Sequence, residues 1–469
     1  MARLRTIVAA GWVVMTIAGS AAVVAGVEPA ASAQDVGAID ATGGSDVTAD
    51  LQALFDRTPD GGVVRLARDG DYRVDGMIVL SDRRDLVIDG NGARIFAGTR
   101  GEPGRNQLRF LGGSGLEVRN LEIQGANPHG GLDGYVPELE FQAAITIAGV
   151  TGIEIDRVNI HDTYGDLIFI DRLKEKDDRD TVGVWIHDST FARSGRQGIA
   201  VIDGRDIVIE RNRFTDMARG TVDLEPLGAL AVENVHIIDN HVGPGRLLFV
   251  PMAGGAPVNR VVIARNTLRG RVLSVSAKTP EGQRRRQFWV VDNTSDAPAT
   301  GPPVEFFRVD GAVVHGNRQP ITKQGEALVT TADTCDVVVA DNNAAPGTRQ
   351  LEGDNRACGR SISLVPPEPP AVAGRGEKER TAAPPAASPP VTATPTTAAP
   401  STTPSTQAAP GSSTTAPTAS TAPTLSALTA ATESPDDGVA VPVVILAMVL
   451  SALVGVGGTL AFTAWRGRR

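Results

Sequence analysis

The sequence predicts an all-β fold in which the chain winds as a parallel β-helix of about ten rungs behind an N-terminal capping helix. Three observations support this prediction. Short strands that end in asparagine recur along the chain, and no pattern typical of a long helix lies between them. Glycine (52 residues) and proline (31) are frequent, whereas aromatic residues make up only 4%. Many short elements joined by turns are therefore expected, and βαβ units are not.

Seven segments share one pattern, a strand of alternating apolar residues with asparagine at its sixth position. From Asn212 onward these asparagines recur every 24 to 28 residues. Stacked strands would place each asparagine above the next, so that their amides could hydrogen-bond along the axis as a ladder. A β-sandwich or propeller would instead require antiparallel hairpins at closer spacing, a rhythm that is absent. The segments end at Asn91, Asn212, Asn240, Asn266, Asn293, Asn317 and Asn342.

A short amphipathic helix is predicted at the start of the coil. Leu51, Leu54 and Phe55 lie at helical spacing within residues 50–57. Such a helix would cover the open end of the first rung, where unpaired strand edges promote aggregation.

The two ends of the chain carry targeting signals. Arg3 and Arg5, an apolar run and a small-residue site before Gln34 are typical of a secretory signal, although an uncleaved anchor stays open. A C-terminal stretch without charge is long enough to span a membrane, and the arginines after it predict a cytoplasmic end. The expected divisions are residues 1–33 (signal peptide), 34–360 (β-helix), 361–437 (disordered stalk rich in Pro, Thr, Ala and Ser), 438–465 (transmembrane helix) and 466–469 (cytoplasmic tail).

The only two cysteines lie near the end of the predicted coil. In an oxidising compartment, a disulfide between Cys335 and Cys358 is expected, although two unpaired thiols stay an alternative. Their spacing does not suggest zinc, and no metal site is predicted. The net charge of −9 argues against a nucleic-acid partner.

The N-terminal part of the predicted coil resembles a known superfamily. Asp35-Val-Gly-Ala38, Pro59–Val64, Tyr72–Gly76 and Leu86–Ala93, together with the capping helix, are similar to the start of pectate-lyase-superfamily proteins. The resemblance covers about residues 34–359. It implies a right-handed parallel β-helix, and many members of that superfamily cut or modify polysaccharides. The motif set of polygalacturonase-like hydrolases and the calcium-binding aspartates of pectate lyases are not recognisable here.

Candidate site residues come from aligning the second strand of each rung by its inward apolar residues. This alignment points Asp223 and Glu225 outward on one face, with Asp171 two rungs away. Phe169 and Phe249 also point outward, where aromatic rings could stack on sugars. Arginines in the preceding turns are expected to bind substrate. They are Arg196, Arg219 and Arg246.

A carboxylate pair beside arginines could hydrolyse a glycoside, because one carboxyl can protonate the leaving oxygen while the other activates water. A polysaccharide lyase could use the same acidic wall to hold a calcium ion. The alternative is that Asp223 and Glu225 only solvate an exposed strand. The expected function is therefore a membrane-anchored extracellular protein that acts on or binds polysaccharide, with a non-catalytic adhesion or carbohydrate-binding module as the rival.

Overall fold

The structure is a computed structural model that describes residues 33–34, 36–174, 178–227, 230–245, 249–252, 254–255, 257–321, 325–343, 347–372 and 375. The predicted transmembrane helix, the cytoplasmic tail and nearly all of the predicted signal peptide and stalk lie outside these residues. In the part of the chain that is described, no helix is long and apolar enough to cross a membrane.

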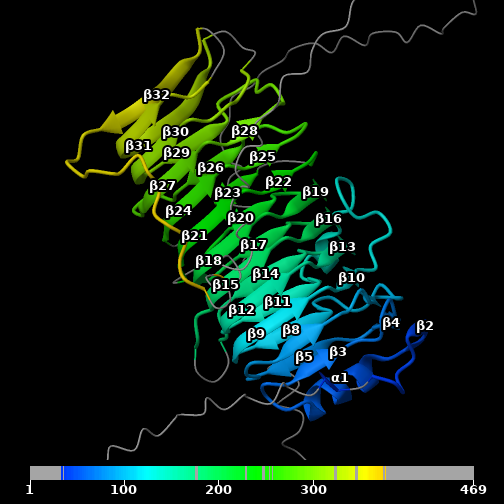
Figure 1. Cartoon of the computed structure of the whole chain (residues 1–469). Helices are drawn as coiled ribbons and strands as arrows, with labels where there is room; N and C mark the ends of the chain where they lie inside the picture. The colour runs from blue at the N-terminus through cyan, green and yellow to red at the C-terminus, as the bar shows by residue number, and fades with distance from the viewer. Residues whose placement is uncertain are drawn as a thin grey trace, which may run out of the picture. The chain divides into compact units, whose positions relative to one another are not determined.

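The described strands stack as the rungs of a parallel β-helix (Figure 1). The predicted fold class, a right-handed parallel β-helix with a capping helix, is confirmed, with about 11 turns instead of ten. Three sheets run along the coil, and the ladder pairings between their rungs are parallel.

The first sheet contains β1 (Ala33–Gln34), β3 (Val63–Arg65), β6 (Val87–Asp89), β9 (Ser114–Arg119), β12 (Thr151–Asp156), β15 (Val182–His187), β18 (Gly204–Glu210), β21 (Val232–Ile238), β24 (Val258–Ala264), β27 (Arg285–Val291), β30 (Val309–His315), β31 (Ala327–Ala340) and β32 (Arg349–Arg356). The second sheet contains β2 (Thr42–Asp46), β4 (Asp71–Arg73), β7 (Arg94–Phe96), β10 (Glu122–Gln124), β13 (Asn159–Thr163), β16 (Thr190–Ser194), β19 (Arg213–Met217), β22 (His241–Val242), β25 (Thr267–Leu268) and β28 (Thr294–Ser295). The third sheet contains β5 (Ile78–Ser81), β8 (Leu108–Leu111), β11 (Ile145–Ala148), β14 (Ile168–Asp171), β17 (Ile199–Val201) and β20 (Val222–Leu224). Beyond β20, strands β23 (Val250–Met252), β26 (Val275–Lys278) and β29 (Val304–Phe307) pair in series and join the first sheet through the long strand β31.

The predicted capping helix is confirmed as α1 (Thr48–Arg57), which lies at the N-terminal end of the coil beside β5 (Figure 1). Its apolar face consists of Leu51, Leu54 and Phe55, and all three side chains are fully buried. The helix therefore covers the interior of the first rung, as its sequence pattern predicts.

Aliphatic side chains fill the interior of the coil in stacked rows. Because side chains alternate along a strand, equivalent inward positions of successive rungs lie above one another. One such row on the first sheet is fully buried, and the outward residues beside it form columns on the surface. The row is Ile88, Val118, Ile155, Ile186, Ile209, Ile237, Ile263, Val290 and Val314.

The predicted asparagine ladder is confirmed for six of its seven members. Each side-chain amide donates to Oδ1 of the next asparagine at 2.9–3.2 Å. That same Oδ1 also accepts the backbone N–H of the asparagine one rung earlier, at 2.9–3.0 Å. The ladder fixes the turn between the first and second sheets. Its members are Asn212, Asn240, Asn266, Asn293, Asn317 and Asn342.

The prediction is wrong for Asn91. Its amide makes only a 3.4 Å contact with the carbonyl oxygen of Leu66. Four residues separate β6 from β7, whereas two separate β18 from β19. Asn91 therefore lies in a longer turn, where it has a left-handed backbone (φ 56°) and does not reach the ladder position.

After β32 the chain turns back along the outer face of the first sheet (Figure 1, yellow). We call this segment, residues 357–372 with Arg375, the strap. The indole N–H of Trp289 donates to the carbonyl oxygen of Ser363 at 2.9 Å, and Val372 is buried against the sheet. Residues 361–372, which the sequence analysis assigned to the stalk, thus pack on the coil.

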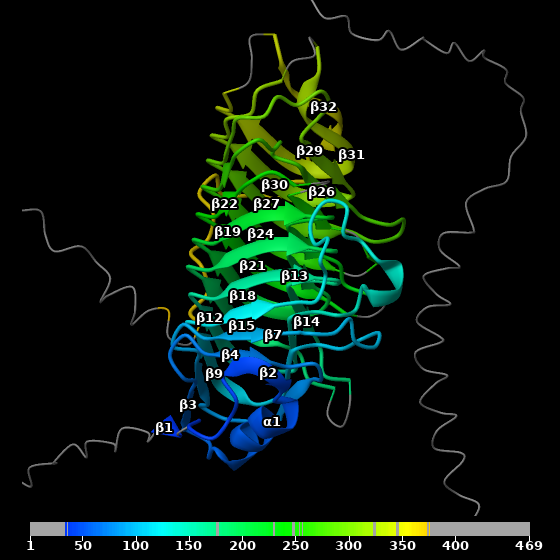
Figure 2. The ribbon, with the colours of Figure 1, turned by 90° about the vertical axis from the view of Figure 1, so that its right-hand side faces the viewer.

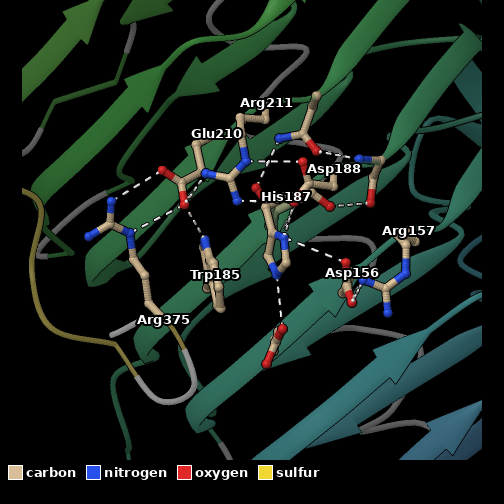
Figure 3. Close-up of polar contacts among 12 residues, drawn as sticks. Asp156, Arg157, Trp185, His187, Asp188, Glu210, Arg211 and Arg375 are labelled. Carbon is tan, nitrogen blue, oxygen red and sulfur yellow. Dashed lines mark hydrogen bonds and ion pairs between the residues drawn. The ribbon is translucent and has the colours of Figure 1, made fainter. Parts of the chain in front are cut away.

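The guanidinium of Arg375 lies 3.3 Å from the carboxylate of Glu210 (Figure 3). Glu210 also accepts the indole N–H of Trp185 at 2.7 Å, and Trp185 stacks on His187 with ring centroids 3.6 Å apart. The strap therefore ends in a buried polar network near the middle of the first sheet.

Cys335 in β31 and Cys358 at the start of the strap form the expected disulfide, with 5.6 Å between their Cα atoms.

We expect the double substitution Cys335→Ser and Cys358→Ser to lower the free energy of unfolding by about 3 kcal/mol, because the crosslink restricts the unfolded chain. Urea denaturation of the purified chain measures the loss. Wild type in reducing buffer should match the double variant, and equal stability of the oxidised and reduced forms would contradict this expectation.

Candidate functional site

The register of the third sheet agrees with the predicted alignment over three rungs. Phe169 pairs with Ala200, and Ala200 pairs with Asp223, so these residues form one outward column. Phe169 is partly exposed, as expected for an outward position on the sheet.

The alignment fails at the next rung, and the prediction for Phe249 is wrong. Phe249 is fully buried within the apolar core. It precedes β23, which begins at Val250, and strict alternation of side chains holds only inside a strand. The backbone N–H of Val222 donates to the carbonyl oxygen of Phe249, which sets Asp223 beside Pro251 in place of an aromatic ring. Arg246, another predicted substrate-binding residue, lies outside the described residues.

Arg196 gathers three carboxylates from different parts of the chain. Its guanidinium lies 2.7 Å from Asp166, 3.5 Å from Glu140 and 3.6 Å from Glu225. Asp166 precedes β14, Glu225 follows β20, and Glu140 lies in the loop between β10 and β11. We call these four residues the Arg196 cluster. Its arginine is 12% exposed, so the ion pairs are largely shielded from water.

Asp223 lies behind this cluster and is almost fully buried. Its Oδ2 accepts the side-chain amide of Gln197 at 2.5 Å, and its Oδ1 has no hydrogen-bond partner among the described residues. Burial, aided by the negative charge of Glu225, raises the pKa of Asp223 to about 8. Asp223 is therefore mainly protonated at neutral pH.

The β10–β11 loop, residues 125–144, contributes Glu140 to the cluster and stands out from the coil in Figure 2 (cyan). It contains the 3-10 helix η1 (Pro137–Leu139). Tyr135 donates its hydroxyl to Glu140 at 2.8 Å, and the guanidinium of Arg219 lies 4.3 Å from the centre of the Tyr135 ring. Arg219, which is predicted to bind substrate, thus contacts this loop.

A hollow of about 220 Å³ opens beside the cluster. Asp166 and Glu140 line it, together with the aromatic rings of Phe169 and Phe141. Phe141 is 55% exposed, so its ring offers apolar surface at the hollow. Arg109 also lines the hollow, and within the described ranges no carboxylate forms an ion pair with it. The hollow thus combines aromatic surface, a cation and two carboxyls.

Asp171 is not part of this site. Its carboxylate accepts the backbone N–H of Arg172 at 2.8 Å and lies 3.7 Å from the ammonium of Lys174. It lies on the third sheet like the cluster, but it contacts Arg172 and Lys174 and no member of the cluster. Burial raises the pKa of Asp171.

Asp166, Gln197 and Glu140 were not among the predicted residues. Asp166 and Gln197 each lie two residues before an inward isoleucine of their strand, so extending the strand alignment upstream would have placed them together. Glu140 lies in a long loop without periodicity, and no sequence signal points to it.

One other group could hold a metal by its chemistry. Ligand atoms of Glu154, Asp156 and His187 lie within 4.8 Å of one another on the first sheet. His187 is already hydrogen-bonded to Glu154 at 2.9 Å, and Arg157 pairs with Asp156 at 2.6 Å (Figure 3). Protein groups therefore satisfy these side chains as a structural network.

No protein-family model and no curated protein matches this sequence. The chain is a parallel β-helix. Solved structures that share this architecture include the Streptococcus pneumoniae surface protein and adhesin PfbA, with a TM-score of 0.47 and 15% identity over 68% of this chain and 98% of that chain. The Azotobacter vinelandii mannuronan C-5 epimerase AlgE6 A-module follows at 0.44 and 15% over 69% and 96%. The Yersinia enterocolitica family 28 exopolygalacturonase is similar at 0.41 and 11% over 68% and 76%. These likenesses are too distant to assign an activity.

Proposed function

We propose that this chain is a cell-surface protein that hydrolyses a polysaccharide at the hollow beside the Arg196 cluster. The observation that carries the proposal is the convergence of Asp166 and Glu140 on a hollow with exposed aromatic surface. Sugar rings stack on such surfaces through their apolar faces, and two carboxyls in different environments supply an acid and a base.

Asp166 is the proposed general acid and Glu140 the proposed general base. Burial raises the pKa of Asp166, which favours the protonated form, while Arg196 opposes that shift. Glu140 accepts the Tyr135 hydroxyl and pairs with Arg196, and both contacts orient its carboxylate. Asp166 would protonate the leaving glycosidic oxygen, and Glu140 would take a proton from the attacking water.

Asp223 and Glu225, which the sequence analysis predicts to be catalytic, have a supporting role in this proposal. Neither Asp223 nor Glu225 lines the hollow, and the carboxylate of Glu225 lies 3.6 Å from the guanidinium of Arg196. Glu225 acts on Asp166 through its negative charge. Asp223 holds the side-chain amide of Gln197, whose backbone N–H donates to Asp166, so both are positioning residues. A lyase that relies on calcium is less well supported, because both carboxyls that line the hollow already pair with Arg196.

Arg109 bears on the class of polysaccharide. Its guanidinium lines the hollow without a carboxylate partner in the described structure, so it is available to a ligand. An acidic sugar placed on Phe169 would bring its carboxylate within reach of this cation. Polysaccharides that carry carboxylate groups are therefore the first substrates to test.

We expect Asp166→Asn and Glu140→Gln each to lower turnover by roughly 100- to 10,000-fold, the usual contribution of a general acid or base. The assay measures new reducing ends from acidic and neutral polysaccharides with the purified chain. Asp171→Asn is the matched control, because this carboxyl also lies on the third sheet but outside the cluster, and its turnover should equal wild type. Circular dichroism checks that each variant is folded.

Turnover that survives both substitutions would contradict the assignment of the acid and base. Ultraviolet absorbance of unsaturated products would instead identify a lyase. Binding on a glycan array with no turnover of any substrate would select the second candidate, a carbohydrate-binding or adhesion module. The ion pairs that already engage Asp166, Glu140 and Glu225 favour this second candidate, because such pairs also serve as structural contacts.

The proposed location is outside the cell. The signal-like start and the uncharged stretch 438–465 support export followed by anchoring in the cell membrane, with the C-terminus in the cytoplasm. Protease treatment of intact cells tests this orientation, since the β-helix should be digested while a C-terminal tag is protected.

A further inference from the structure

A second hollow, of about 480 Å³, opens where strands of the second sheet end. Residues that follow β7 and β10 line it, together with Asp162 of β13 and Arg193 of β16. None of the described residues that line it is aromatic, and its neutral polar side chains are those of Thr99, Gln124 and Asn127. Such walls suit a hydrophilic ligand.

This hollow carries a surplus of positive charge. Asp162 is the carboxylate that lines it, and the guanidinium of Arg193 already pairs with that carboxylate at 2.6 Å. Arg100 lines the hollow as well, and it is exposed. Its guanidinium lies 5.7 Å from the centre of the Tyr164 ring, and no carboxylate in the described part of the chain forms an ion pair with it. Arg100 is therefore a cation that a ligand in the hollow can reach.

The β7–β8 connection, residues 97–107, lies between the two hollows. Its first residues line the second hollow and its last residues line the hollow beside the Arg196 cluster. Gln142 of the β10–β11 loop donates to the carbonyl oxygen of Arg100 at 3.0 Å and so fixes this connection. The two hollows share the rungs of β7, β10 and β13, so a line from one to the other runs across the coil.

Arg105 adds a buried cation to the same connection. It is 9% exposed, and its guanidinium donates to the carbonyl oxygen of Thr99 at 2.8 Å. Burial lowers the pKa of Arg105, and the nearby carboxylate of Asp75 already pairs with Arg73 at 2.7 Å. An anion bound at this connection would therefore offset positive charge that the described carboxylates leave poorly balanced.

We propose that one acidic polysaccharide chain occupies both hollows, with one oxyanion group on Arg100 in the second hollow and another on Arg109 in the first. The inference rests on the function proposed for the first hollow and extends it, because the chain would cross the coil and not follow its axis. Carboxylate and sulfate groups bind guanidinium through charge-assisted hydrogen bonds. The hydroxyl of Thr99 and the amide of Gln124 can bind sugar hydroxyls.

Galacturonate oligomers of two to six units test this arrangement by isothermal titration calorimetry. The full chain carries Asp166→Asn throughout, so that the probe is not cleaved. Affinity should rise with oligomer length. Adding Arg100→Gln should lower the affinity for the hexamer about tenfold, the effect of one charge-assisted hydrogen bond, and leave that for the dimer unchanged. Arg109→Gln should weaken the binding of both oligomers.

Arg57→Gln is the matched control, because it removes the same charge from α1, outside both hollows. It should bind every oligomer as the parent protein does. The fully methyl-esterified hexamer lacks the carboxylates, so Arg100→Gln should not alter its binding. A sulfated hexasaccharide that binds more tightly than the galacturonate hexamer, and loses that advantage in Arg100→Gln, would identify sulfate as the group that Arg100 recognises.

Equal affinity of the parent protein and Arg100→Gln for both acidic hexamers would overturn the inference, as would a parent protein that binds neither. The assay does not depend on turnover. A chain that binds the hexamer through Arg100 but cleaves no polysaccharide would therefore support this inference and contradict only the hydrolytic function.

Discussion

Substitution of Asn266 by alanine is expected to lower the free energy of unfolding by about 4 kcal/mol. Its amide donates to the carbonyl oxygen of Ile237 at 2.8 Å and to Oδ1 of Asn293 at 2.9 Å. Its Oδ1 accepts the backbone N–H and the side-chain amide of Asn240. Alanine removes all four bonds and leaves buried partners unsatisfied, at about 1 kcal/mol for each bond. Denaturation in urea measures the difference.

Asn91→Ala is the matched control for this prediction. Asn91 shares the sequence pattern but lies outside the ladder, with one long contact to Leu66. We expect a loss of about 1 kcal/mol, because alanine is strained at the left-handed backbone of this residue. Equal losses for Asn266→Ala and Asn91→Ala would show that the ladder contributes little to stability.

Asp223→Asn is expected to stabilise the protein at alkaline pH. The pKa of Asp223 is about 8 in the folded chain, whereas an aspartate in an unfolded chain titrates near 3.8. The folded state therefore holds a proton that the unfolded state has released, so wild type loses stability as pH rises from about 4 to 8. Asparagine mimics the neutral carboxyl and does not titrate. At pH 9 the variant should be more stable by several kcal/mol, because each pKa unit corresponds to about 1.4 kcal/mol.

Thermal or urea unfolding at pH 4, 7 and 9 tests this prediction, and the two proteins should converge at pH 4. Asp296→Asn is the control, because folding shifts the pKa of Asp296 in the opposite direction to that of Asp223. Asp296 is exposed, and its pKa is lowered by the backbone N–H of Gly270. The stability that the ionised Asp296 contributes is present above about pH 4 and is lost in acid. The Asp296→Asn variant should therefore not gain stability at pH 9. A pH-independent difference between wild type and Asp223→Asn would contradict the proposed protonation state.

The repeating parts of the fold could be predicted from the sequence because their physical cause is periodic. The buried row that contains Ile209 and Ile237, and the ladder that follows it, recur once per rung. Periodicity failed where a turn changed length. The two extra residues after β6 moved Asn91 out of the ladder, and Phe249 entered the core because it precedes its strand.

The candidate site could be predicted only in part. Outward positions on β14 and β20 followed from alternation, so Phe169 and Asp223 were found. Their burial could not be predicted, because it depends on the β10–β11 loop and on Pro251 in the next rung. Glu140 reaches Arg196 through a loop with no repeat, and only the folded chain reveals that contact.

The return of the strap also escaped prediction, because its proline-rich composition is typical of a linker. The strap covers Trp289 and Val291, which lie on a distant strand. An apolar column on the outer face of a sheet, from Trp185 to Val313, was the available signal, since solvent-exposed strands usually carry polar residues there.

The route of the strap has a mechanical consequence. The last described residue, Arg375, lies beside Glu210, several rungs before the final strand β32. Tension on the chain beyond Arg375 would first slide the strap along the sheet, so that its contacts resist in shear. The terminal rung would not be peeled open until those contacts had broken, and the crosslink at Cys358 would then carry the load to β31.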